Sequence, residues 1–468
     1  MNPSTEETPT ANQAYSSPLS PLREMMLIAV PTILQMASYT IQQFTDIVML
    51  SRVSDVHATA AGNGGLVAWC FMSFGFGMLF IVNAMAGQAF GAGRKRECGE
   101  HLWQGIWLGL IYAAVLTVPS VMFGHYVFDL FNHSPQMTAL ETEYFWILMT
   151  FLVVKMMSAA CGQFLLAIDR PNVVLLAAVS GVVVNIVSNY ILIYGHFGMP
   201  AMGVAGAAWG TNIGGICELL ILVFVAFSPK VRQTYNSLAW RFNRAKFSEL
   251  VRVGIPSGLQ TTGDIAAWTI FLVGVMARYG EAALAANNYM MQYMKLSFMP
   301  AFGFGTAVSV LVARYVGAGK PDVAKHRAHL GFKITAVYMV ACGLLFLTMP
   351  GALMRLFTTD PEVIRIGKIL FIFCAIYQFA DAAFIIYSSA LRGVKDTLIP
   401  SIVQISLCWS LVVGGGVLVS IYAPQLGVGG PWAIGAVYGA ILGVFLFLRF
   451  KNGAWQYATA SPDEPRTQ

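Results

Sequence analysis

Six ionisable residues lie inside long apolar stretches of the 468-residue chain. They are Asp46, Lys155, Glu218, Asp264, Lys295 and Asp381. An ionisable side chain at membrane depth costs at least about 2.5–3.5 kcal/mol on insertion scales, so each of the six is a candidate functional residue. The competing interpretation is a side chain near the end of its stretch that extends to the membrane surface. That interpretation applies most to Asp46, less to Glu218, and least to Asp381 in the middle of its stretch.

Polar neighbours at helical spacing indicate what some of these stretches could bind. Tyr377 precedes Asp381 by four residues, so their phenol and carboxylate share one helix face. Asn185 and Asn189 have the same spacing. Carboxylate, amide and hydroxyl oxygens can replace water around a hard cation such as Na⁺, and a buried carboxylate can instead bind a proton. For the asparagine pair, hydrogen bonding between helices is the alternative.

The composition determines which elements must carry these residues. Hydrophobic residues make up 57% of the chain and charged residues only 11%, whereas soluble proteins carry roughly 25% charged residues. The 22 acidic and 28 basic residues cannot cover the surface of a soluble chain of this length. A water-soluble enzyme and a disordered protein are therefore excluded.

Twelve stretches are long and apolar enough to span a membrane, which requires about 20 residues each. Their ranges are 26–50, 64–88, 102–124, 144–167, 173–194, 203–227, 255–277, 284–313, 332–350, 369–391, 399–421 and 431–448. Helices satisfy their own backbone hydrogen bonds in lipid, and the alternating strands of a β-barrel are absent from the sequence. The predicted fold class is an all-α polytopic membrane protein with twelve transmembrane helices.

Lysine and arginine are distributed unequally between the two sides of these stretches. One side carries 21 of the 28 basic residues and the other carries 5, with two more inside the stretches. Because cytoplasmic loops are enriched in basic residues, both termini are predicted to be cytoplasmic, in a multi-pass protein of the inner membrane. The same bias explains the net charge of +6, so no nucleic-acid partner is indicated.

The chain also contains an internal repeat. Ala-Phe-Gly-Ala-Gly-Arg at 89–94 recurs as Tyr-Val-Gly-Ala-Gly-Lys at 315–320, a shift of 226 residues. The repeat predicts two pseudo-symmetric six-helix bundles that enter the membrane in the same direction, an arrangement suited to alternating access. The predicted division is a disordered cytoplasmic tail at 1–22, an N-terminal lobe at 23–228, a cytoplasmic linker at 229–252, a C-terminal lobe at 253–451 and a cytoplasmic tail at 452–468.

The two intramembrane lysines, Lys155 and Lys295, carry positive charges and therefore argue against a simple cation-binding site. At the shift of 226, Lys155 is the counterpart of Asp381, so the two lobes carry opposite charges at equivalent depth. We hypothesise that Lys155, Lys295 or both pair with an intramembrane acid, with Glu218 among the candidate charge partners, because pairing lowers the cost of burial.

From Leu22 to Lys451 the chain resembles the multidrug and toxic compound extrusion (MATE) family of secondary transporters. The resemblance lies in the order and spacing of Phe-Thr-Asp-Ile-Val-Met (44–49), Gly-Gln-Ala-Phe-Gly-Ala-Gly-Arg (87–94), Asn-Tyr-Ile-Leu-Ile-Tyr-Gly-His-Phe-Gly-Met-Pro (189–200), Gly-Val-Ala-Gly-Ala-Ala-Trp-Gly-Thr (203–211), Arg-Val-Gly-Ile-Pro-Ser-Gly-Leu-Gln (252–260) and Ala-Leu-Arg-Gly-Val-Lys-Asp-Thr (390–397). It implies two lobes around a V-shaped cleft, and export of cationic or amphipathic compounds against entry of Na⁺ or H⁺.

The resemblance also implies roles for individual residues. In the N-terminal lobe it places a site for cation or proton coupling at Asp46, Asn185, Asn189 and Thr211, with Asn189 standing where some members have a second aspartate. In the C-terminal lobe it implies a second coupling site at Asp264, Tyr377 and Asp381. At Asp264 many members carry the longer glutamate.

Our prediction is therefore a monomeric antiporter of small molecules in the lipid bilayer, with no enzymatic activity, no cofactor beyond the coupling H⁺ or Na⁺, and no metal other than Na⁺. One alternative is a flippase of the related superfamily that moves a lipid-linked saccharide, which the two lysines favour. A polytopic membrane enzyme would need a nucleophile or metal constellation, and we find none in the sequence. The parallel repeat argues against a passive channel.

Overall fold

The computed structural model describes residues 15–131, 133–453 and 455, and every regular element in this part of the chain is helical. The predicted tails at 1–22 and 452–468 lie mostly outside the described residues, so their disorder and location stay predictions.

The first bundle precedes the linker. Its helices are α1 (Pro21–Ser51), α2 (Asp55–Gly91), α3 (Glu97–Asp129), α4 (Pro135–Thr150), α5 (Leu152–Ala167), α6 (Pro171–Tyr194) and α7 (Val204–Ala226). The short helix α8 (Pro229–Tyr235) lies in the linker itself.

The second bundle begins with α9 (Arg244–Ile270), which continues through a π-helical turn (Phe271–Val275) and a 3₁₀ turn (Met276–Tyr279). It goes on with α10 (Glu281–Gly317), α11 (Pro321–Thr348), α12 (Pro350–Arg355) and α13 (Pro361–Gly393). The last span but one is α14 (Leu398–Leu407), a π-helical segment (Cys408–Gly415) and α15 (Gly416–Tyr422). A 3₁₀ turn (Pro424–Leu426) then leads into α16 (Gly429–Lys451).

Local capping chemistry determines where several of these helices begin. The side chains of Ser20, Ser54 and Ser134 each accept a hydrogen bond from the backbone amide three residues later. Each bond satisfies one of the donors that a helix N-terminus leaves free. Pro21 and Pro135 follow their caps directly, at the position where a helix does not need a backbone N–H.

Among the described residues, eleven helical segments are long and apolar enough to cross a membrane. Helices α4 and α5, which are bent by 48° at Phe151, together make a twelfth. The predicted all-α fold with twelve spans is confirmed, and each predicted stretch falls on one of these segments. The bend at Phe151 was not predicted.

The helix boundaries repeat with the shift seen in the sequence. The bounds of α2 and α10 differ by 226 at both ends, and so do the start of α4 and the start of α13. Left-handed backbone recurs at the same shift, at Gly93 and Gly319 and at Asp169 and Lys395. The two bundles are therefore structural repeats, as predicted.

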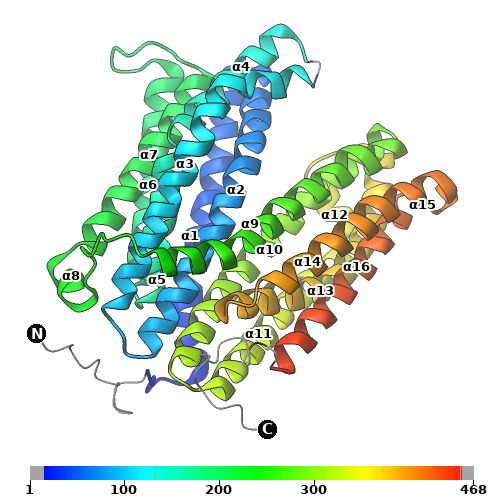
Figure 1. Cartoon of the computed structure of the whole chain (residues 1–468). Coiled ribbons are helices and arrows are strands. Elements are labelled where there is room, and N and C mark those ends of the chain that lie inside the picture. The colour runs from blue at the N-terminus through cyan, green and yellow to red at the C-terminus, as the bar shows by residue number, and fades with distance from the viewer. Residues whose placement is uncertain (1–14, 132, 454, 456–468) are drawn as a thin grey trace, which may run out of the picture.

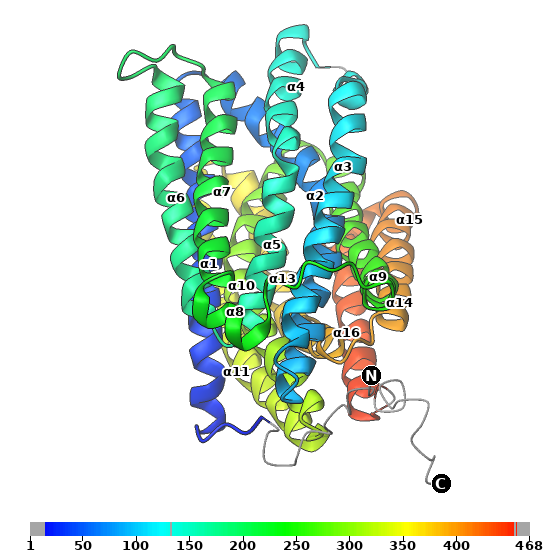
Figure 2. The ribbon, with the colours of Figure 1, turned by 60° about the vertical axis from the view of Figure 1, so that its left-hand side comes forward.

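The two bundles form a V. Helix α1 begins and α16 ends at one end of the molecule, at the bottom of Figure 1, which we call the terminal end. The bundles lie close together there and diverge toward the opposite end (Figure 1). Figure 2 shows the first bundle from its outer side, with helices of the second bundle behind it. The predicted V-shaped pair of lobes is thus confirmed.

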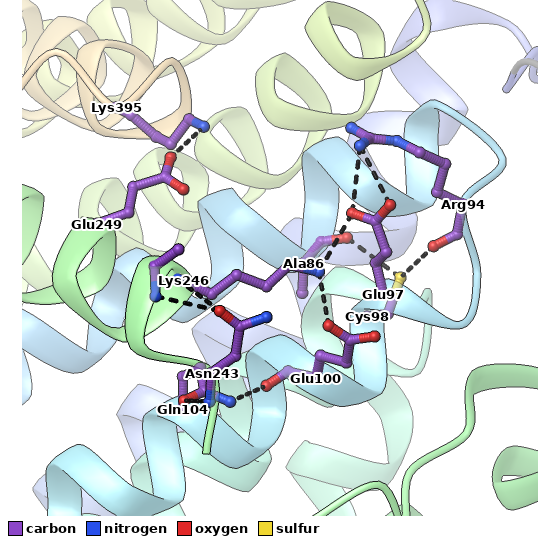
Figure 3. Close-up of polar contacts among 11 residues, drawn as sticks. Ala86, Arg94, Glu97, Cys98, Glu100, Gln104, Asn243, Lys246, Glu249 and Lys395 are labelled. Atoms are coloured by element: carbon purple, nitrogen blue, oxygen red, sulfur yellow. Dashed lines mark hydrogen bonds and ion pairs between the residues drawn. The ribbon is translucent and has the colours of Figure 1, made fainter. Parts of the chain in front are cut away.

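Hydrogen bonds hold the linker against α3 at the terminal end. The indole N–H groups of Trp103 and Trp107 donate to the carbonyl oxygens of Ser237 and Trp240, at 2.7 and 3.2 Å. Lys246, in the first turn of α9, forms an ion pair of 2.7 Å with Glu100 on α3 (Figure 3). Residues of the second bundle are thus held directly on the first.

A pair of repeat-related residues joins the lobes deeper in the terminal end. Arg314 on α10 has no exposed surface, and its guanidinium donates to the carbonyl oxygens of Leu166 and Ala167 at 3.0 and 3.2 Å. It also forms an ion pair of 2.9 Å with Asp169. Gln88 on α2 is the counterpart of Arg314 at the shift of 226, and its amide donates to the Gly393 carbonyl oxygen at 3.0 Å. Each lobe therefore donates hydrogen bonds to the C-terminal end of a helix in the other lobe, from α10 to α5 and from α2 to α13.

Two glycines allow these helices to approach so closely. A Cβ atom on Gly91 would lie 1.8 Å from the Arg314 carbonyl oxygen, and one on Gly317 would lie 2.0 Å from the Gln88 carbonyl oxygen. Gly91 and Gly317 are again related by 226 residues. Any larger residue at either position would push α2 and α10 apart.

A buried carboxylate completes the contact between the lobes. Glu24 on α1 accepts hydrogen bonds from the phenols of Tyr15 and Tyr315, at 3.0 and 2.9 Å, and pairs with Arg327 of α11 at 2.8 Å. Burial, the largest influence, raises the pKa of the Tyr15 phenol to about 12, so it stays protonated and continues to donate near neutral pH. We call the set of Tyr15, Glu24, Gln88, Arg314, Tyr315 and Arg327 the interlobe network.

Candidate functional site

The polar residues expected in the N-terminal lobe come together where α1 meets α6. The Asn189 amide donates to Asp46 Oδ1 at 2.5 Å, and its distance to Asn185 Oδ1 is 3.4 Å. Both asparagines are fully buried, and Asp46 is 8% exposed. Asp46 therefore does not extend to the surface but points into the bundle.

Thr211 on α7 joins the same cluster. Its Oγ1 accepts a hydrogen bond from the Asn185 amide at 3.3 Å, and it lies next to the Asp46 carboxyl group. The helices can meet here because position 210 is glycine, where a Cβ atom would lie 1.9 Å from Asn189 Oδ1. All four residues predicted for this lobe are thus neighbours, and we call them the N-terminal cluster.

The N-terminal cluster has an unused acceptor. Asn189 Oδ1 is buried and has no hydrogen-bond partner among the described residues. An orphaned buried acceptor is rare in proteins and calls for an explanation such as an ion or a water molecule. Amide, hydroxyl and carboxylate oxygens suit Na⁺, so the donor set fits that ion.

Two lysines lie at membrane depth, Lys155 on α5 and Lys295 on α10. In the part of the chain that the structure describes, neither Lys155 nor Lys295 forms a hydrogen bond or ion pair with a carboxylate. The ammonium of Lys155 lies against α7 at Gly215, and its charge acts on Asp46. The hypothesis that the lysines pair with acids stays a prediction.

Glu218 has a partner that the sequence did not indicate. Its carboxylate accepts a hydrogen bond of 2.5 Å from the phenol of Tyr39 on α1. The match of Val-Pro at 30–31 with Ile-Pro at 255–256 gives a local shift of 225, at which Tyr39 is the counterpart of Asp264. The first lobe therefore has Tyr39 and Lys155 where the second has Asp264 and Asp381.

The second predicted group lies between α9 and α13, and we call Asp264, Tyr377 and Asp381 the C-terminal cluster. Asp381 and Tyr377 are each 5% exposed, and the charges of Asp264 and Asp381 act on each other and on Tyr377. The Tyr377 ring packs edge-on against Trp268, which is one helical turn after Asp264, with ring centroids 6.0 Å apart. The structure thus brings the three residues within electrostatic range of one another, and their role in binding a coupling ion stays a prediction.

The two acids of the C-terminal cluster differ in their partners. Asp264 Oδ1 accepts a hydrogen bond from the Gln404 amide at 3.2 Å and a weaker one from the Cys408 thiol at 3.9 Å. Within the described residues, Asp264 Oδ2 and both Asp381 oxygens have no hydrogen-bond partner. The charge of Asp264 acts unfavourably on that of Asp381 when both are ionised, so a bound proton or cation stabilises the pair.

Several residues of these surroundings were missed from the sequence. Tyr39, Gln260 and Gln404 are polar residues inside apolar stretches, and that was the available signal. Glutamine and tyrosine occur often enough in membrane helices that the signal is weak without a structure.

A family model described as MatE matches residues 31–191 and 265–415. Among curated proteins, the multidrug resistance protein PmpM of Pseudomonas aeruginosa is 27% identical over 404 residues, which cover 83% of this chain and 82% of that protein. The probable multidrug resistance protein NorM of Chromobacterium violaceum is 26% identical over 92% of this chain and 93% of its own length.

Solved structures match the fold over nearly the whole chain. A structure described as the outward-facing conformation of a multidrug resistance MATE family transporter superposes with a TM-score of 0.85, at 19% identity, over 95% of this chain and 98% of that one. A transporter of Pyrococcus furiosus, whose binding pocket is described as having reverse polarity, gives a TM-score of 0.84 over the same shares of the two chains, also at 19% identity.

Proposed function

Since this chain belongs to the MatE family of multidrug efflux transporters, we propose that it is a secondary antiporter that exports cationic or amphipathic small molecules in exchange for H⁺ or Na⁺. The family consists of transporters, so the chain is a polytopic membrane transporter and not an enzyme. The exchange and its mechanism are the parts that we propose.

The observation that carries the proposal is the pair of acids in the C-terminal cluster, in which Asp381 and one oxygen of Asp264 have no hydrogen-bond partner among the described residues. Asp381 is almost fully buried without a hydrogen bond among the described residues, and the charge of Asp264 acts on it. A charge on the buried Asp381 is costly, and more so when the partly exposed Asp264 is also ionised, unless a proton or cation neutralises it. A cationic substrate and the coupling ion would compete for this neutralising role, which is what exchange requires.

The arrangement of the lobes supports alternating access. The lobes are joined at the terminal end by the interlobe network and diverge at the other end. With cytoplasmic termini, as the distribution of basic residues predicts, this conformation would open away from the cytoplasm. Ion binding would favour one orientation and substrate binding the other, so coupling is the difference in affinity of each ligand for the two states.

Location and assembly follow from the same considerations. We propose that the protein lies in the inner membrane as a monomer, with both termini and the linker in the cytoplasm. Helices α9 and α10 of the second lobe both pack on α2 of the first within one chain, so the two halves need no second copy to form the interface between them.

Purified protein in proteoliposomes tests this function. The cationic dye ethidium is added outside, and its accumulation is followed with an acid-inside pH gradient, with a high internal Na⁺ concentration, or with neither. Accumulation driven by one gradient is the expected result and identifies the coupling ion. Failure of both gradients, with gradient-independent movement of a lipid-linked saccharide, would instead identify a flippase.

Gly210→Ala is expected to impair the N-terminal cluster without changing a charge. The new Cβ atom would lie 1.9 Å from Asn189 Oδ1, so Asn189 must move away from Asp46. Loss of one charge-assisted hydrogen bond costs about 1.5–3 kcal/mol, so the half-maximal concentration of the coupling ion for ethidium export should change at least about tenfold.

The matched control for this prediction is Gly62→Ala. Gly62 also lies in a helix of the first lobe, but a Cβ atom there would have no neighbour within 4 Å. Its export should equal that of the wild type. Equal export by the Gly210→Ala variant would show that the N-terminal cluster does not take part in coupling.

A further inference from the structure

A buried chain of amide and hydroxyl groups lies behind Asp264 in the second lobe. It consists of Gln260 on α9, Ser388 on α13, and Ser401 and Gln404 on α14. Gln404 is 2% exposed and Gln260 is 6% exposed, and both serines are buried. Asp264 itself is partly exposed, so the chain approaches it from the interior of the lobe.

The hydrogen bonds of this chain run in one direction. The Ser401 hydroxyl donates to Gln260 Oε1 at 3.4 Å, and the Gln260 amide donates to Gln404 Oε1 and, at 3.1 Å, to Ser388 Oγ. The Gln404 amide then donates to Asp264 Oδ1 at 3.2 Å. Because the Gln404 oxygen is already an acceptor for Gln260, its amide N–H must face the carboxylate.

These hydrogen bonds distinguish the two carboxylate oxygens of Asp264. Oδ1 is fixed by Gln404, while Oδ2 has no hydrogen-bond partner among the described residues and is free to bind a proton or cation. Hydrogen bonds to an ionised carboxylate are roughly twice as strong as those to a neutral acceptor. Binding of a proton to Asp264 therefore weakens its bond to Gln404 on α14.

The two helices joined by this bond share an unusual local geometry. Both α9 and α14 run into π-helical segments within two turns of the bond, at Phe271–Val275 and at Cys408–Gly415. These segments contact each other, and Gly416, which directly follows the second one, also packs on the first: a Cβ atom there would lie 3.4 to 3.5 Å from Val275 and Phe271. π-helical turns are rare and often mark functional positions in helices.

We propose that Gln404, oriented by Gln260, is a positioning residue that sets the affinity of Asp264 for the coupling ion and transmits ion binding to α14. The proposal rests on the proposed antiport function and adds to it a residue outside the predicted C-terminal cluster. The alternative is that the glutamine pair only holds the helices of the lobe together.

The test is the concentration of the coupling ion that gives half-maximal ethidium accumulation in proteoliposomes, measured for wild type, Gln404→Leu and Gln378→Leu. Leucine keeps the approximate volume of glutamine and removes its donor. Gln378 is the matched control, since it is equally buried on α13 but donates to Ser297 Oγ at 2.7 Å and not to a carboxylate.

Gln404→Leu is expected to shift the half-maximal concentration about tenfold, the effect of one hydrogen bond to a charged group. With protons as the coupling ion, the shift is toward lower proton concentration, because the ionised carboxylate has lost a donor. Gln378→Leu should stay within about twofold of wild type. Gln260→Met leaves the hydrogen bond from Gln404 to Asp264 possible but removes the donor that orients Gln404. Its half-maximal concentration should shift in the same direction by a smaller factor.

Equal half-maximal concentrations in Gln404→Leu and Gln378→Leu would overturn the proposal and leave the glutamines a structural role. If the Gln404→Leu variant does not fold, a half-maximal concentration of Gln260→Met equal to that of Gln378→Leu would overturn the proposal instead. Absence of gradient-driven accumulation in the wild type would instead contradict the antiport function itself, so the two failures are distinguishable.

Discussion

Asp381→Asn is expected to abolish gradient-driven export while leaving the protein inserted and folded. Asparagine has nearly the same shape but cannot exchange a proton and carries no charge for a cation, and the side chain it replaces has no hydrogen bond among the described residues that would be lost. Coupling free energies of about 1–3 kcal/mol correspond to factors of roughly 5–150, so ethidium accumulation should fall at least about fivefold.

Two further variants make this prediction specific. Asp381→Glu keeps an ionisable group on the same helix face and should retain part of the export. Asp322→Asn makes the same chemical change at an exposed position on α11 and should export like the wild type. Wild-type accumulation by Asp381→Asn would show that this carboxylate is not the exchanging group.

Arg314→Ala is expected to release the lobes from each other at the terminal end. The guanidinium is fully buried, donates to two carbonyl oxygens at the end of α5, pairs with Asp169, and lies over the Phe90 ring at 5.0 Å. Loss of these contacts should favour the separated state by about 3 kcal/mol, the scale of one or two hydrogen bonds to a charged group. That corresponds to a factor of roughly 100 in the opening equilibrium.

Amide hydrogen exchange measures this opening. Residues 86–94 and 312–320, where α2 and α10 touch, should exchange up to about 100-fold faster in Arg314→Ala than in the wild type. Gln88→Ala is the repeat-related control, which removes one neutral hydrogen bond worth about 1 kcal/mol and should accelerate exchange only about fivefold. Unchanged exchange in Arg314→Ala would mean that the interlobe network does not hold the lobes together.

The architecture was largely predictable from the sequence because it depends on long local patterns. Apolar stretches of about 20 residues must be helices in lipid, and the shift of 226 at 89–94 and 315–320 recurs in the helix bounds of α2 and α10. The bend between α4 and α5 was not predictable, since Phe151 is flanked by Thr150 and Leu152 without proline or glycine. Packing of the surrounding helices, rather than a local breaker, must produce it.

For some candidate residues the sequence predicts that they lie close together, and for others it does not. Tyr377 and Asp381 share a helix face, so their proximity follows from their spacing. Asp264 and Gln404 are 140 residues apart, and no periodic pattern in the sequence brings them together. Arg314 is one of the 21 basic residues on the side that the charge distribution predicts to be cytoplasmic, but the structure buries it completely between the lobes. A rule based on charge counts says nothing about which of those charges make tertiary contacts.

The most direct test of the central claim is the release of the coupling ion when substrate binds to the purified protein. Ethidium is added to the detergent-solubilised protein in weakly buffered solution, and H⁺ release is recorded with a pH indicator and Na⁺ release with a sodium electrode. If the acids of the C-terminal cluster exchange the ion for substrate, wild type releases an ion on binding ethidium and the Asp264→Asn, Asp381→Asn double variant does not. Binding of ethidium by the wild type with no release of either ion would contradict the account.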